Sequence, residues 1–104
     1  MNTEIRVKNK LEFESIIKNN KRICNSYFVI YYKERKNDFS RFGISLSKHF
    51  GNAVKRNKYK RKLREIIRIN QKKFKNDYDY IIIMKKTCDG LEYKLIEEKL
   101  LSLL

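Results

Sequence analysis

A dense run of basic residues lies between Gly51 and Arg68. Seven of the ten residues from 55 to 64 are basic: Lys55, Arg56, Lys58, Lys60, Arg61, Lys62 and Arg64. One carboxylate, Glu65, interrupts the run before Arg68. Like charges on neighbouring helical turns repel by about 0.2–0.5 kcal/mol per pair. An unmixed run of this kind therefore indicates a surface that binds phosphate groups, and a solvated basic face without a ligand is the alternative.

The sequence offers little material for catalysis by the protein itself. A protein nuclease needs paired histidines or clustered carboxylates that hold metal ions, and the chain has a single histidine, His49. An acidic pair, Asp77 and Asp79, flanks Tyr78 at the start of a predicted strand, where we interpret both charges as solvated. We therefore predict no catalytic and no metal-binding residue in this chain.

The composition limits the possible partners. A chain of 104 residues with a net charge of +14 is long enough for one domain, residues 1–104, with a modest core. Such a charge favours a nucleic acid or an anionic membrane as partner. No run approaches about 18 apolar residues, and the first residues are too polar for a signal peptide. Cys24 and Cys88 form no CxxC pair, so we expect free thiols, a cytoplasmic location and no disulfide-linked partner.

The basic run has the spacing of a helix that packs against a sheet. Its apolar residues fall at i, i+4, i+7 and i+8, on one helical face: Tyr59, Leu63, Ile66 and Ile67. Asn52 is the predicted N-cap, after the flexible Gly51, and the helix is expected to run from residue 53 or 54 to about 71. Strands are predicted on both sides, at 41–47 and 78–86. The apolar run 81–84 is typical of a central strand, so we predict a βαβ crossover with parallel strands.

The remaining segments complete a single α/β domain, an α+β sandwich. A helix is predicted at 9–20, a short strand within 21–25, a strand at 27–32 and a charged turn at 33–40. A last helix at 91–104 would bury a stripe formed by Leu91, Leu95, Ile96, Lys99, Leu100 and Leu104. The predicted order is α-β-β-β-α-β-α, with helices packed against one central sheet.

The segment from Phe42 to Arg68 resembles the protein subunit of bacterial ribonuclease P. That family carries a G-(L/V)-S-(V/I)-S-(K/R)-K strand end, followed by G-N-A-V-x-R-N-R-x-K-R-x-x-R-(E/Q) at the start of a long helix. The matching residues are Gly43, Ser45, Ser47, Lys48, Gly51, Asn52, Ala53, Val54, Arg56, Asn57, Lys60, Arg61, Arg64 and Glu65. The similarity extends over residues 6–104.

Three positions depart from the family pattern. Lys58 replaces an arginine, which keeps the charge but loses the two-pronged contact with phosphate. His49 stands where lysine is common, and it carries less positive charge at neutral pH. Ile17 stands where many relatives have phenylalanine, which removes one stacking surface.

The resemblance implies a protein that binds ribonuclease P RNA and precursor tRNA, with one protein per RNA and no membrane partner. It would assist endonucleolytic removal of the tRNA 5′ leader, while the RNA holds Mg²⁺ and performs catalysis. The implied RNA-binding residues are Lys48, His49, Arg56, Asn57, Lys58, Lys60, Arg61, Arg64 and Arg68. Phe13, Ile17 and Tyr31 would line a leader-binding cleft. The family also implies a left-handed crossover, against the usual right-handed preference.

Several alternatives stay open from the residues alone. The pattern alone favours ordinary packing of a helix on a sheet for Phe13 and Ile17, and only the resemblance gives the leader-binding role equal weight. The amide of Asn57 could bond a phosphate or a 2′-hydroxyl, or could cap local backbone. A non-catalytic protein that binds structured RNA or associates with ribosomes would use the same basic helix. Attachment to an anionic membrane fits less well, because the apolar stripe of the helix is narrow.

Overall fold

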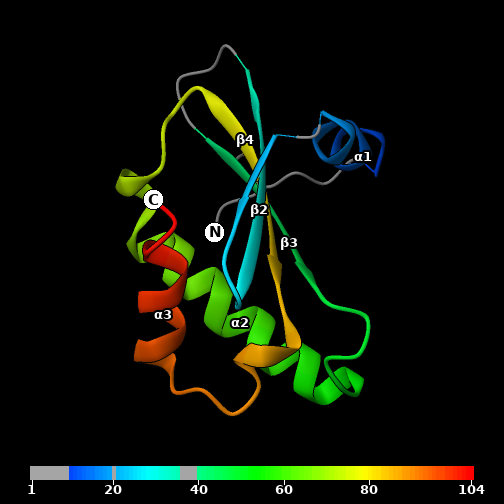
Figure 1. Ribbon diagram of the computed structural model, residues 1–104, viewed down its shortest axis with the longest axis vertical. Helices are drawn as coiled ribbons and strands as arrows, with labels where there is room; N and C mark the ends of the chain where they lie inside the picture. The colour runs from blue at the N-terminus through cyan, green and yellow to red at the C-terminus, as the bar shows by residue number, and fades with distance from the viewer. Residues whose placement is uncertain (1–9, 20, 36–39) are drawn as a thin grey trace.

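The computed structural model describes residues 10–19, 21–35 and 40–104 (Figure 1). The elements in chain order are α1 (Lys10–Lys18), β1 (Arg22–Cys24), β2 (Phe28–Glu34), β3 (Arg41–Leu46), α2 (Ala53–Ile69), β4 (Tyr78–Met84) and α3 (Tyr93–Leu101). Short 3₁₀ helices, η2 (Gln71–Lys73) and η3 (Lys86–Cys88), follow α2 and β4. This order confirms the predicted α-β-β-β-α-β-α arrangement. Residues 9 and 20 of the first predicted helix, and residues 36–39 of the predicted charged turn, lie outside the described residues.

The strands form one mixed sheet in the order β1-β2-β4-β3. β4 is central: it pairs antiparallel with β2 and parallel with β3, and Arg41 lies opposite Asp79. Its apolar run is buried as predicted at Ile81, Ile82 and Met84, whereas Ile83 is half-buried. The β3–α2–β4 segment is therefore the predicted crossover between parallel strands.

The two faces of the sheet carry different helices. The larger core lies on the side of α2 and α3, where Phe28 and Ile82 of the sheet share one cluster with Leu63 and Ile96. A smaller cluster around Ile16 and Ile81 lies under α1. Figure 1 shows α1 apart from α2 and α3. Because strand side chains alternate between faces, β2 and β4 supply residues to both clusters.

Helix α2 forms largely as its sequence predicts. Tyr59, Leu63, Ile66 and Ile67 are its buried residues, and the Asn52 side chain accepts a hydrogen bond from the Lys55 amide at 3.0 Å. Gly51 precedes the cap with φ +133°, in a region that side chains rarely adopt. The helix ends at Ile69, slightly before the predicted residue 71.

Asn70 is the C-cap residue of α2, with φ −103° and ψ 16°. Its side-chain amide donates to the Ile66 carbonyl at 2.8 Å, and its backbone amide donates to the same oxygen at 3.1 Å. The backbone bond is the last regular hydrogen bond of the helix, and the side chain adds a second donor to the same carbonyl.

The last helix is shorter than predicted, and its buried stripe is narrower. α3 buries Ile96 and Leu100, whereas Leu95 is 39% and Leu104 is 48% exposed. Including Leu95 in the stripe was wrong, because the position of α3 on the core buries only Ile96 and Leu100 of this helix. Leu104 lies beyond the end of the helix, so helical spacing does not govern its position.

Candidate nucleic-acid interface

The outer face of α2 carries most of the predicted RNA-binding residues. Asn57, Lys58, Arg61 and Arg68 are exposed, and Lys60 and Arg64 are half-buried. Lys48 and His49 are exposed in the turn between β3 and α2. The structure thus presents cations along the helix and at the loop that leads into it.

Arg56 joins these two parts of the surface. Its guanidinium donates from Nη1 to the Ser47 carbonyl at 2.9 Å and from Nη2 to the Leu46 carbonyl at 3.4 Å. These bonds tie the first turn of α2 to the end of β3. Arg56 therefore also has a structural role that its place in the basic run did not reveal.

Some cations near α2 already have partners within the protein. Lys55 Nζ lies 2.6 Å from Asp89 Oδ2, and Arg68 Nη2 lies 2.5 Å from Glu65 Oε1. The hydrogen bond with Asp89 raises the pKa of Lys55, and the same bond lowers the pKa of Asp89. In the same way, the Arg68 guanidinium lowers the pKa of Glu65. These charges contribute less than the others to attraction of a polyanion.

Other cations of α2 have no ion-pair partner among the described residues. Within residues 10–19, 21–35 and 40–104, no ion pair involves Lys58, Lys60, Arg61 or Arg64. Their positive charge is therefore not neutralised by a neighbouring carboxylate. A helix face of this kind can contact several successive phosphates of an RNA backbone.

The three residues of the predicted cleft come together on the opposite face of the sheet. Phe13 and Ile17 of α1 and Tyr31 of β2 pack around the buried pair Ile16 and Ile81. All three are half-buried, so each both supports α1 and presents part of its surface to solvent. Packing and ligand contact are thus compatible at these positions.

Gly43 allows α1 to approach the sheet closely. A Cβ atom on Gly43 would lie 2.6 Å from Ile81 Cδ1 and 2.8 Å from Phe13 Cε2, closer than side chains normally approach. The glycine of the strand motif therefore seats the Phe13 ring against the sheet. Its φ is not in the left-handed region, so the requirement is for space and not for backbone freedom.

Arg22 is a further member of this surface that the sequence did not identify. Its guanidinium lies 6.0 Å from the Tyr31 ring centre, and Nη1 donates to the Tyr31 hydroxyl at 3.3 Å. The two residues are paired across β1 and β2. Only the strand register, which the sequence did not supply, could have connected them.

The interpretation of Asp79 as a solvated charge was wrong. Asp77 is exposed, but Asp79 is 4% exposed and binds two arginines. Arg41 donates to both of its carboxylate oxygens, at 3.0 and 2.8 Å, and Arg35 Nε lies 2.9 Å from Oδ1. The parallel register places Arg41 opposite Asp79, so the carboxylate is neutralised inside the fold.

The same arginine connects the sheet to α1. Arg41 Nη2 lies 2.7 Å from Glu12 Oε2, and its hydrogen bond with Asp79 raises the pKa of Arg41. A second polar contact, from Lys33 Nζ to Ser15 Oγ at 2.9 Å, also holds α1. The group formed by Glu12, Arg35, Arg41 and Asp79 is called the α1 clamp below.

The described part of the chain gives little support for metal binding, thiol chemistry or membrane insertion. No group of three or more His, Cys, Asp or Glu residues there could hold a metal ion. Cys24 and Cys88 are both free thiols, and burial raises the pKa of Cys88 to about 11, so this thiol is poorly reactive. No helix within the described ranges has the length and apolar character needed to cross a membrane.

Comparison with known proteins gives a consistent result. The sequence model of the family described as Ribonuclease P matches residues 1–104. The ribonuclease P protein component of Streptococcus agalactiae is 40% identical over 104 residues, which cover 100% of this chain and 94% of that protein. The component of Finegoldia magna is 39% identical over 102 residues, covering 97% and 88%.

Solved structures agree with the sequence comparison. The fold is similar to the RNase P protein from Thermotoga maritima, with a TM-score of 0.87, 35% identity and coverage of 95% of this chain and 94% of that one. The Staphylococcus aureus RNase P protein superposes with a TM-score of 0.85 at 34% identity, covering 95% and 91%.

Proposed function

This chain belongs to the ribonuclease P protein family, whose members are subunits of a tRNA-processing ribonucleoprotein, and on that premise we propose a division of labour between its two surfaces. The outer face of α2, with the turn before it, binds the catalytic RNA. The cleft between α1 and the sheet binds the 5′ leader of precursor tRNA. One protein chain serves one RNA.

The observation that carries this proposal is the set of unpaired cations on α2. Lys58, Lys60, Arg61 and Arg64 have no ion-pair partner among the described residues, and Lys48 and His49 extend the surface. Each phosphate that these side chains neutralise releases counterions, so affinity falls steeply as salt rises. Such contacts read the RNA backbone without reading its sequence.

The cleft suits a single strand of variable sequence. Phe13 and Tyr31 present aromatic surface, and stacking on an aromatic ring contributes about 1–3 kcal/mol per base whichever base is present. Ile17 adds apolar contact but has no ring. This chain therefore offers the leader one stacking surface fewer than relatives that have phenylalanine at this position.

We place catalysis in the RNA subunit, with Mg²⁺ held by that RNA. The described residues of this chain supply no cluster of ligands for the ion, and its acidic pair is divided between an exposed Asp77 and an Asp79 engaged by two arginines. The protein assists by adding positive charge, which lowers the repulsion between two RNAs. A general structured-RNA-binding or ribosome-associated protein is not favoured, since the whole chain matches the ribonuclease P family.

Reconstitution with the cognate catalytic RNA tests the proposal. We expect the protein to lower the Mg²⁺ concentration needed for leader cleavage and to lower the KM for precursor tRNA. A protein that leaves both quantities unchanged would refute the assignment. Phe13→Ala should weaken binding of leader-bearing tRNA about tenfold, while binding of mature tRNA, which lacks the leader, should stay within about twofold.

A further inference from the structure

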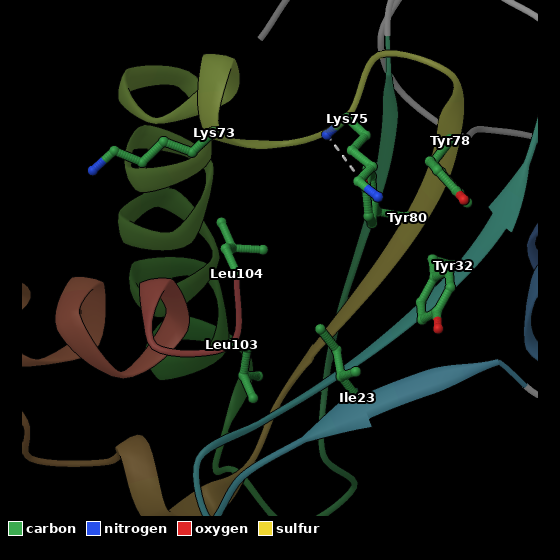
Figure 2. Close-up of a pocket in the computed structure, with 8 residues that line it drawn as sticks. All are labelled: Ile23, Tyr32, Lys73, Lys75, Tyr78, Tyr80, Leu103 and Leu104. Atoms are coloured by element: carbon green, nitrogen blue, oxygen red, sulfur yellow. Dashed lines mark hydrogen bonds between the residues drawn. The ribbon is translucent and has the colours of Figure 1, made fainter.

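A pocket of about 320 Å³ lies on the α2/α3 side of the sheet, away from both surfaces described above. Its lining residues are Ile23, Tyr32, Lys73, Lys75, Tyr78, Tyr80, Leu103 and Leu104 (Figure 2). Tyr31 faces α1, whereas the next residue, Tyr32, packs with the opposite cluster. The leader cleft and this pocket therefore lie on opposite faces of the same strand.

Aromatic rings form one wall of the pocket. Tyr32 and Tyr78 meet edge to face with ring centres 5.8 Å apart, and Tyr78 lies 6.0 Å from Tyr80. Tyr80 is buried, stacks on Phe42 at 5.6 Å and accepts a hydrogen bond from the Lys75 amide at 3.1 Å. The wall is thus fixed by the core behind it. Figure 2 shows Ile23 and the two leucines below and across from these rings.

The side chains that line the pocket are cationic or neutral. Lys75 Nζ lies 5.8 Å from the Tyr78 ring centre, and no Asp or Glu side chain lines the cavity. In Figure 2 the Lys73 amine points away from the tyrosines, so Lys73 lines the pocket with its stem. Lys75 is therefore the cation that a ligand in the pocket would meet.

We propose that this pocket binds one unpaired nucleotide of RNA, with its base against Tyr32 and Tyr78 and its phosphate at Lys75. Aromatic and aliphatic walls take a flat base, and the neighbouring ammonium takes the negative charge, which is the combination that single-strand binding sites use. The volume is near the lower limit of about 300 Å³ for ligand pockets, so it suits one nucleotide and excludes a helix. A chain of net charge +14 also concentrates RNA near its surface.

Titration of the full chain, followed by NMR, tests this site with three probes: AMP, adenosine and inorganic phosphate. We expect AMP to shift the methyl signals of Ile23 and Leu103 saturably. Adenosine should shift the same signals with weaker affinity, and phosphate alone should act mainly at α2. If AMP gives no saturable shift at Ile23 and Leu103, the proposal fails. Neither result depends on whether the protein assists a catalytic RNA.

Matched variants separate the site from general charge attraction. Tyr78→Leu should weaken AMP binding about tenfold, and Tyr78→Phe, which keeps the ring, should stay within about twofold. Lys75→Gln should weaken it about fivefold, whereas Lys72→Gln, an equal loss of charge at an exposed position nearby, should have little effect. Equal losses in the two lysine variants would overturn the proposal. Retained folding is checked from the amide spectrum of each variant.

Discussion

Much of the positive charge on the outer face of α2 is unpaired, whereas the charges of the α1 clamp are paired. On α2, Lys58 and Arg61 project from the helix with no ion-pair partner among the described residues. In the clamp, Asp79 is 4% exposed and is engaged by Arg35 and Arg41. In the clamp, the Asp79 carboxylate of β4 neutralises the arginines. Helix α2, in contrast, has a single carboxylate, Glu65, among its cations. Unpaired charge therefore marks the surface that we propose binds RNA, and paired charge marks the support of α1.

Asp79→Asn tests the paired side of this comparison and should have the largest effect on stability. The substitution leaves Arg35 and Arg41 without their buried partner. Removing one member of a buried ion pair costs about 3–5 kcal/mol, and we expect about 2–4 kcal/mol here because both arginines keep some contact with water. Urea unfolding measures the change.

Asp77→Asn is the matched control for that measurement. Asp77 is exposed, so its loss should change the free energy of unfolding by less than about 0.5 kcal/mol. Equal effects of the two substitutions would show that the clamp does not stabilise the fold.

Gly43→Ala should have the next largest effect, because it forces α1 away from the sheet. The added methyl group would meet Ile81 and Phe13 at 2.6 and 2.8 Å, and overpacking of this kind costs about 1–3 kcal/mol. Leader affinity should fall with stability, while affinity for the catalytic RNA should not. Filter binding with both RNAs checks this. Ser45→Ala, on the same strand, adds no bulk, and a loss of leader affinity as large as that of Gly43→Ala would argue against displacement of Phe13.

Asp89→Asn should have the smallest effect, and that effect should depend on pH. Lys55 lowers the pKa of Asp89 in the folded protein, so the pair stabilises the fold above the ordinary aspartate pKa of about 3.9. This contribution is lost as pH falls through the lowered pKa that Asp89 has in the folded protein. The stability difference between wild type and variant should therefore be present at neutral pH and vanish in acid. Urea midpoints across this range measure it, and a difference independent of pH would contradict the pairing.

Periodicity predicted most of the fold. The buried stripe of α2, its Asn52 cap and the central strand around Ile81 and Ile82 all follow from local spacing, because burial of a regular element repeats with its period. Local spacing could not tell that Leu95 faces solvent, since the position of α3 on the core decides which apolar residues it buries. It also did not fix the end of α2, which lies at the Asn70 cap.

From the residue pattern alone, the site was predictable only where it depends on one element. The cleft residues Phe13, Ile17 and Tyr31, from α1 and β2, were connected through the family resemblance. The exposed cations of α2 belong to a single helix, so the sequence identifies them directly. The α1 clamp combines Glu12, Arg41 and Asp79 from three elements, and Arg22 reaches Tyr31 across two strands. Such groups depend on strand register, which the sequence pattern did not provide, and Asp79 was misinterpreted for that reason.

The salt dependence of binding to the catalytic RNA tests the central claim most directly. Arg61→Gln combined with Arg64→Gln removes two unpaired cations from α2, and Lys86→Gln combined with Lys94→Gln removes two exposed cations elsewhere. We predict that the first pair lowers the slope of log K against log salt by about two, or one per lost contact. The second pair should leave the slope nearly unchanged. An unchanged slope for the α2 pair, or equal changes for both pairs, would contradict the assignment of RNA binding to this helix.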